Sequence, residues 1–241
     1  MSAVPGILAD SALLNALYGL LGRRAGLHLL FQTDVDGFNP AVFHQKCNTK
    51  GPTVTVIRLA DQTVCGGYTP YQWGTRSPQY HNEPGTFLFR LKYRNQQPAA
   101  YKATPNSNFV HDNASYGPIF GGGNGHDLMA FNGNAANGTH TPRSYTYPPD
   151  PLTGGSYPLT GGHAQLAAPG AYTVHVYQVL PTDVKAGGSR RGGGKYTLST
   201  LPSPWLSAPP PLDQDALSAL RDQLQVTRPR SQPAARRAMA A

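Results

Sequence analysis

The sequence predicts a mainly β protein: a two-sheet antiparallel β-sandwich flanked by short helices, with a Gly/Pro-rich C-terminal tail. Composition is the first reason. The chain has 27 Gly, 23 Pro and 13 Tyr, and its charged residues make up 13%, roughly half the usual share. Glu83 is the one glutamate, whereas exposed helical faces ordinarily carry many Glu and Lys. The second reason is that short alternating segments are separated by Gly, Pro and Asn clusters, without helix-length crossovers.

The clearest strand covers residues 53–57, because Thr, Val and Ile alternate there and are β-branched throughout. A short apolar run at 28–32 indicates a buried strand, and further strands are expected at 66–68, 87–93, 128–131 and 172–179. In segment 87–93, apolar side chains alternate with Arg90 and Lys92, which predicts a strand with one exposed face. Long loops are expected at 94–115 and 132–170, and loops of this length are either functional or poorly ordered.

Two short helices are expected near the N-terminus. Between Ile7 and Leu21 the leucines recur mainly at three- and four-residue steps, which is typical of an amphipathic helix. Asp10 or Ser11 could cap its start, and Gly22 suits its end. A second helix is expected at 41–47. The resulting organisation is an N-terminal amphipathic helix in residues 1–27, a sandwich in 28–180, and a basic Pro/Gly-rich tail in 181–241 that holds one short helix at 212–225.

The net charge of +8 is concentrated in the tail. Residues 182–241 hold nine basic and four acidic side chains, so 9 − 4 = +5 of the total lies there. Such an excess indicates an acidic partner, and charge alone leaves nucleic acid, anionic lipid and acidic protein surfaces open. We expect protein partners in a larger complex rather than nucleic acid. The predicted partner-binding residues are Arg190, Arg191, Lys195, Arg228, Arg230, Arg236 and Arg237.

No catalytic, cofactor or metal site is expected. None of the eight histidines pairs with a His, Cys or acid at helix or finger spacing: His28, His44, His81, His111, His126, His140, His163 and His175. Asp34 and Asp36 beside Gly37 lack the other ligands of a calcium loop, so turn chemistry is the better interpretation.

The remaining motifs also favour structural roles. Cys47 and His44 lie three residues apart without an orienting third group, which favours a packed thiol over a catalytic dyad. Residues 188–196 lack the spacing of a phosphate-binding loop, so we interpret them as a basic linker. The glycines at 121–123 indicate a tight turn or bulge where backbones approach. An enzyme acting through Cys47 or a histidine is therefore the weakest hypothesis.

The apolar stretch at 13–21 is shorter than the roughly 20 residues of a membrane span, and no basic segment precedes it. Cys47 and Cys65 are too few for a disulfide framework, so free thiols in a reducing compartment are expected. These observations predict a cytoplasmic protein without a transmembrane helix.

Several blocks of the sequence resemble a TLDc domain. The opening block runs through Leu29-Leu30-Phe31, Asp36-Gly37-Phe38, Phe43-His44-Gln45-Lys46-Cys47 and Lys50-Gly51-Pro52-Thr53-Val54-Thr55-Val56-Ile57. Further blocks are Gly66-Gly67-Tyr68-Thr69 with Trp73, then Phe87-Leu88-Phe89, then Gly121-Gly122-Gly123 with Asp127-Leu128, and a closing strand from Tyr172 to Val179. The resemblance covers roughly residues 28–180.

This resemblance implies a two-sheet β-sandwich flanked by short helices and no accepted catalytic centre. The family includes oxidation-resistance proteins, which protect cells from oxidative stress and bind the vacuolar proton-pumping ATPase. The interferon-induced 44 group is similar but continues into a GTPase domain. Gln178 stands where the closing block of the family usually carries a glutamate.

Two functional hypotheses follow. The first is a non-catalytic, TLDc-like protein-interaction module that is a structural subunit of a larger assembly and docks by its basic tail. A cytoskeletal or axonemal lattice is its natural candidate, because microtubule surfaces are acidic. The alternative, implied by the resemblance, is a stress-protective regulator that binds the vacuolar proton-pumping ATPase.

Overall fold

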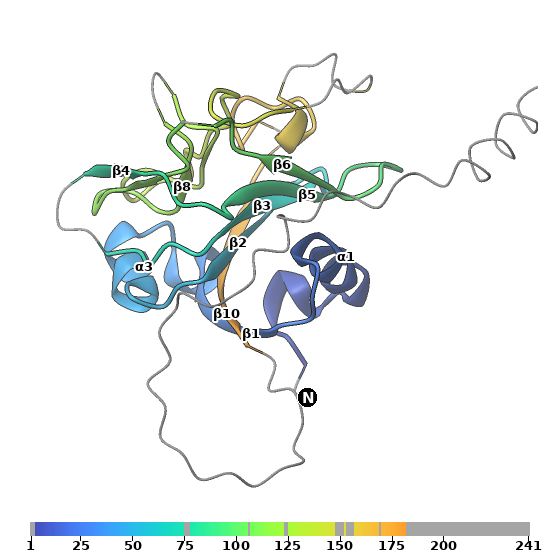
Figure 1. Ribbon diagram of the computed structural model, residues 1–241, viewed down its shortest axis with the longest axis horizontal. Helices are drawn as coiled ribbons and strands as arrows, with labels where there is room; N and C mark the ends of the chain where they lie inside the picture. Colours follow the sequence, from blue (N-terminus) through green and yellow to red (C-terminus); the bar gives the residue numbers. More distant parts are fainter. Residues whose placement is uncertain are drawn as a thin grey trace, which may run out of the picture. The chain divides into compact units, whose positions relative to one another are not determined.

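The computed structural model describes residues 3–74, 78–105, 107–122, 125–147, 152, 157–168 and 170–181 (Figure 1). Within them the chain forms two antiparallel β-sheets and a few short helices, which confirms the predicted fold class. The helix expected at 212–225 lies outside the described residues.

Sheet A, the larger sheet, has six strands in the order β1-β10-β2-β3-β5-β6, and every neighbouring pair is antiparallel. The last of the described strands along the chain, β10, therefore lies between the first two. The strands are β1 (Gly26–Gln32), β2 (Thr53–Arg58), β3 (Val64–Thr69), β5 (Phe87–Lys92), β6 (Ala99–Lys102) and β10 (Thr173–Leu180).

Sheet B, the smaller sheet, has four strands in the order β4-β7-β8-β9. They are β4 (Gln79–His81), β7 (Val110–Asp112), β8 (Ile119–Phe120) and β9 (Leu128–Met129). The expected loop at 94–115 was wrong in part, because β6 and β7 lie inside it. Strands of two to four residues are too short to show a recognisable alternation, so β6 and β7 could not be predicted from the sequence.

The helices are short and flank sheet A. They are η1 (Gly6–Ala9), α1 (Ser11–Leu21), α2 (Thr33–Asp36), α3 (Pro40–Cys47) and η2 (Pro158–Thr160). The expected ends of α1 are confirmed. The Asp10 carboxylate accepts hydrogen bonds from the N–H groups of Ala12 and Leu13, and Gly22 closes the helix in the left-handed conformation with φ of 68°.

Both faces of sheet A are covered (Figure 1). On one face, η1 and α1 pack Leu8, Leu13 and Leu17 against side chains such as Val54 and Phe89. On the other face, sheet B and its loops pack against the side chains of sheet A that point away from η1 and α1. That second cluster includes Ile57, Cys65, Leu88, Val110, Phe120, Leu128 and Phe131.

Coverage on both faces corrects the prediction for β5. Its Arg90 was expected to face solvent, but the side chain is buried and donates hydrogen bonds to the Pro158 carbonyl and to Gln96. Lys92, at the end of the strand, is exposed as expected. The alternation in segment 87–93 thus distinguishes two buried faces, one lined by aliphatic and aromatic groups and one that accommodates a guanidinium.

The strand expected at 28–32 is present, but its predicted burial was wrong. β1 lies at the edge of sheet A, His28 is exposed, and Phe31 is its one fully buried residue. An apolar run indicates that a strand tends to be buried. Whether the strand lies at the edge or the centre of its sheet depends instead on pairing with segments distant in the sequence.

Candidate functional site

The seven basic residues predicted to bind a partner all lie between residues 190 and 237, outside the described part of the chain. Their role stays a prediction. Residues 188–196, interpreted as a basic linker, and Gly123 also lie outside the described part, whereas Asp34, His44, Cys47 and His175 are described.

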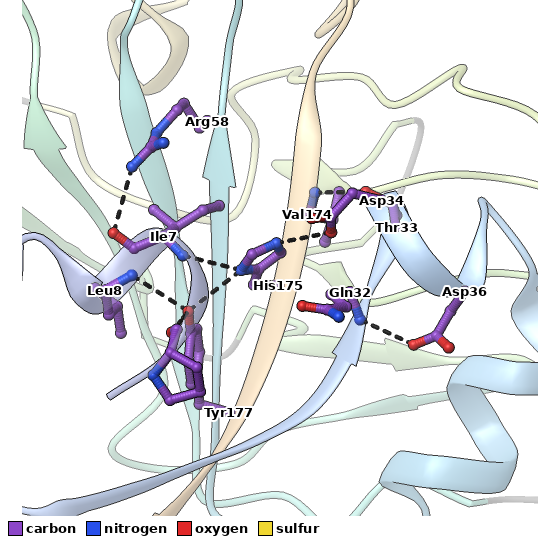
Figure 2. A network of polar contacts seen from close by, with 11 residues as sticks. Ile7, Leu8, Gln32, Thr33, Asp34, Asp36, Arg58, Val174, His175 and Tyr177 are labelled. Atoms are coloured by element: carbon purple, nitrogen blue, oxygen red, sulfur yellow. Dashed lines mark hydrogen bonds and ion pairs between the residues drawn. The ribbon is translucent and has the colours of Figure 1, made fainter. Parts of the chain in front are cut away.

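A polar network on the helix-covered face of sheet A joins β10 to η1 and α2 (Figure 2). His175 of β10 lies at its centre. Its Nδ1 is 3.0 Å from the backbone nitrogen of Ile7, and its Nε2 is 3.0 Å from Oδ1 of Asp34. Two residues along β10, the hydroxyl of Tyr177 donates to the Pro5 carbonyl at 2.9 Å and accepts from the Leu8 N–H at 3.3 Å.

These partners determine the tautomer of His175. A backbone N–H can only donate, so Nδ1 must accept and the proton must lie on Nε2, which donates to Asp34. Burial is the main cause that lowers the pKa of His175, and Asp34 opposes it. The imidazole is therefore neutral at pH 7, and both nitrogens are committed to contacts within the chain. Such a histidine has no free nitrogen with which to act as a general base or metal ligand.

The glycine at position 6 lets the backbone of η1 approach the ring of His175 closely. Gly6 has φ of +73°, and a Cβ atom at this position would lie 2.3 Å from Nδ1 of His175. Arg58 of β2 donates to the Ile7 carbonyl at 3.3 Å. We call residues 5–8 together with Arg58, His175 and Tyr177 the η1 socket.

The sequence did not reveal the η1 socket. Asp34 and His175 are 141 positions apart, and no local spacing joins them. Asp34 was assigned to turn chemistry, and it lies in the one-turn helix α2; its additional contact with His175 was not predicted. Asp36 does act locally: it accepts from the Gln32 N–H at 3.1 Å and pairs with Lys46 at 2.6 Å.

A second polar centre lies at the start of β9 in sheet B, where the carboxylate of Asp127 is fully buried. It accepts hydrogen bonds from the N–H groups of Arg143 (2.9 Å), Ser144 (2.7 Å) and Tyr145 (3.1 Å), and from the Tyr147 hydroxyl (3.1 Å). Burial raises the pKa of Asp127, while these hydrogen bonds act in the opposite direction. The carboxylate thus holds segment 143–147 next to the start of β9.

The close approach expected at the 121–123 glycines involves Asp127. Gly121 has φ of +82°, and a Cβ there would lie 2.1 Å from Oδ2 of Asp127. His140 adds a further tie, because its Nδ1 donates to the Asp127 carbonyl and its Nε2 accepts from Leu159 N–H at 3.4 Å. Burial lowers the pKa of His140 to about 4, so this imidazole is neutral over the physiological range.

Two other histidines come together in sheet B and the adjoining loop. The ring of His111 stacks on Tyr80 at 4.3 Å between centroids and on His126 at 5.2 Å. Burial, and then the neighbouring His126, lower the pKa of His111. Sequence reasoning missed this stack because its members come from three separate segments. Among the described residues, no group of three or more His, Cys, Asp or Glu side chains has an arrangement that could hold a metal ion.

Both cysteines are buried and free. Burial raises the pKa of Cys47, and it raises the pKa of Cys65 to about 12. His44 is turned to other partners: Nδ1 lies 2.9 Å from Oδ1 of Asn48, and Nε2 donates to the Asn113 carbonyl at 3.1 Å. The His44–Cys47 pair therefore has the packed arrangement that was expected. None of the helices in the described ranges is long and apolar enough to cross a membrane.

The sequence model of the TLDc domain family matches residues 4–161, which is more than half of the chain. The chain belongs to the TLDc domain family. The matched range includes η1 and α1 and ends before β10, although β10 lies inside sheet A of this TLDc domain, between β1 and β2. No curated protein matches the chain significantly.

Proposed function

We propose that this TLDc protein is a non-catalytic interaction module, a structural subunit of a larger assembly that docks on an acidic partner through its basic tail. The observation that carries the proposal is where the buried polar groups are directed. His175, Asp127 and His140 direct their hydrogen bonds largely at backbone atoms of the same chain. Groups used in this way stabilise loops, and within the described residues they do not converge on a substrate.

The charge distribution supports tail docking. Residues 1–181 hold eleven basic and eight acidic side chains, so 11 − 8 = +3, whereas the shorter segment 182–241 has 9 − 4 = +5. A Gly/Pro-rich segment can present its charges to a surface without dismantling a core. A microtubule lattice, cytoskeletal or axonemal, is the partner we propose, because it offers a repeated acidic surface. The corresponding location is the cytoplasm, at the cytoskeleton or cilium.

Cosedimentation of the full chain with microtubules tests this proposal. In the test variant, glutamine replaces all seven residues: Arg190, Arg191, Lys195, Arg228, Arg230, Arg236 and Arg237. In the matched control, lysine replaces the six arginines, so the charge is retained. Each exposed pair contributes about 0–1 kcal/mol, so the loss is expected only when all seven are neutralised together. Wild type and control should bind, and their affinity should fall with salt because such contacts are screened over about 8 Å at physiological ionic strength.

Equal affinities and equal salt slopes for the wild type and the glutamine variant would refute docking by the tail. Absence of microtubule binding by the wild type would refute the choice of partner. The melting temperature of the three proteins should be the same, since the substituted residues lie outside the described core.

Membership in the TLDc family favours a second candidate, a stress-protective regulator of the vacuolar proton-pumping ATPase. Capture of the purified ATPase by the full chain, and protection of cells against peroxide, would support it. Here the glutamine variant separates the two proposals. Retained ATPase binding by that variant would place the activity in the TLDc domain rather than in the tail.

A further inference from the structure

We propose that the η1 socket is a pH-gated latch: neutral His175 holds η1 on sheet A, and protonation of its imidazole detaches residues 5–9. The proposal is independent of what the tail binds. It rests on the contacts between η1 and β10 and on which atoms can donate and accept (Figure 2).

The polar backbone groups of this segment depend on three side chains of sheet A. The Pro5 carbonyl and the Leu8 N–H both contact the Tyr177 hydroxyl, the Ile7 N–H contacts Nδ1 of His175, and the Ile7 carbonyl contacts Arg58. Among these, His175 alone changes its hydrogen-bonding character between pH 5 and 8.

Protonation would reverse the contact with Ile7. In the imidazolium both ring nitrogens donate, so Nδ1–H would point at the Ile7 N–H across 3.0 Å, and the Ile7 N–H would lose its acceptor. A buried donor that loses its acceptor is destabilised, because the cost of removing it from water is no longer compensated by a hydrogen bond. Gly6 leaves no space for the ring to move toward η1, since even a methyl group at that position would overlap Nδ1.

The charged and titratable groups around His175 act in known directions. Asp34 of α2 favours the imidazolium, Arg58 of β2 disfavours it, and the Tyr177 hydroxyl lies 3.3 Å from Nδ1. The cross-strand neighbours, Gln32 of β1 and Val56 of β2, carry no charge, and η1 contributes no ionisable side chain.

The pH window follows from burial. The pKa of His175 in the folded chain lies below its ordinary value of about 6.5, so the unfolded or detached form binds the proton more readily. The latch is therefore fully closed above that ordinary value and weakens as the pH falls below it. Detachment would uncover Ile7 and Leu8, both buried in the helix-side core, together with the sheet surface beneath them.

Amide hydrogen exchange on the full chain tests the latch. We expect protection of the Ile7 and Leu8 amides, corrected for intrinsic exchange rates, to fall between pH 7.5 and pH 5.0, because the detached form binds the proton more readily than the attached form. Amides of β2 serve as the internal reference and should keep their protection. Equal loss in β2 would show that the whole domain opens, and unchanged protection at Ile7 would refute the latch.

Three variants sharpen the test. His175→Asn keeps an acceptor near the Nδ1 position without a titrating group, so Ile7 protection should no longer depend on pH. Asp34→Asn, at a half-exposed position, removes the charge that favours the imidazolium and should move the transition to lower pH. The matched control is His28→Asn, because His28 is exposed on β1 and should leave the wild-type transition unchanged. A wild-type pH dependence in both His175→Asn and Asp34→Asn would overturn the proposal, and Asp34→Asn alone decides it if the first variant does not fold.

Discussion

Sheet A and sheet B are built by different means. In sheet A, β10 and β2 pair over six residues, and both faces of the sheet are covered by apolar side chains. In sheet B, β7 and β8 share a single residue pair, Val110 with Phe120. The connections around sheet B are held instead by side chains bonded to backbone, such as Asp127 to segment 143–147 and the Tyr145 hydroxyl to the Phe109 carbonyl at 2.7 Å.

This difference shows how a domain can remain ordered where regular pairing ends. A long ladder satisfies its own backbone, so apolar packing is enough to hold it. Loops that run through the interior have no such ladder, and buried polar side chains must satisfy their N–H and C=O groups. We therefore expect sheet A to be most sensitive to lost volume and sheet B to lost hydrogen-bond acceptors.

The largest effect is expected from Phe89→Ala in sheet A. Phe89 is fully buried between β5 and α1, and loss of such a side chain reduces the free energy of unfolding by about 3–5 kcal/mol. Urea unfolding measures it. Val35→Ala, at a position that is 71% exposed, is the control and should change stability by less than about 0.5 kcal/mol. A similar small change for Phe89→Ala would contradict the packing described for sheet A.

Acidification should destabilise the sheet B side by a comparable amount. His140 is neutral in the folded chain, with a pKa of about 4, whereas the unfolded chain protonates near 6.5. The unfolded state thus binds more protons in this interval, and the free energy of unfolding should fall by about 3 kcal/mol as the pH drops from 7 to below 4. Urea titrations of wild type and His140→Gln at several pH values measure this, and the variant should show the weaker pH dependence. Identical pH profiles would exclude His140 as the source.

Asp127→Asn should have a smaller effect that is confined to one region. The amide keeps one acceptor oxygen but presents N–H groups where a carboxylate oxygen accepted, so one or more buried N–H groups lose their partner at about 1–3 kcal/mol. Hydrogen exchange should show lost protection in segment 143–147 with little change in β2 and β3. Loss spread equally over both sheets would mean that the two sheets open as one unit.

The two cysteines should be unreactive in the native protein and dispensable for partner binding. Burial raises the pKa of both thiols, so the native protein should resist alkylation at pH 8 and react only after denaturation. Rapid labelling of the native chain would show that the core around Cys47 or Cys65 opens readily. A Cys47→Ala/Cys65→Ala variant should still bind its partner, because neither thiol has a functional contact.

The contrast between the two sheets also explains which elements could be predicted from the sequence. Strands β1, β2, β5 and β10 of sheet A, together with α1, its Asp10 cap and α3, follow from local patterns that span five or more residues. Strand β8 has two residues, and the contacts of Asp127 and His175 join segments far apart, so no local pattern encodes them. The division into 1–27, 28–180 and 181–241 stays a prediction.

The position of β10 has a consequence for how the chain is made. Strand β1 emerges early in synthesis, yet its partner in sheet A is β10, about 150 residues later. One edge of β2 likewise pairs with β10 and stays unpaired until β10 has been synthesised. Contacts of such long sequence separation carry a large loop-closure entropy and slow folding. Until residue 180 is available, β1 and β2 present unpaired edges, which invite intermolecular association. A fragment cut at residue 161, where the family match ends, would keep those edges permanently and should aggregate rather than fold.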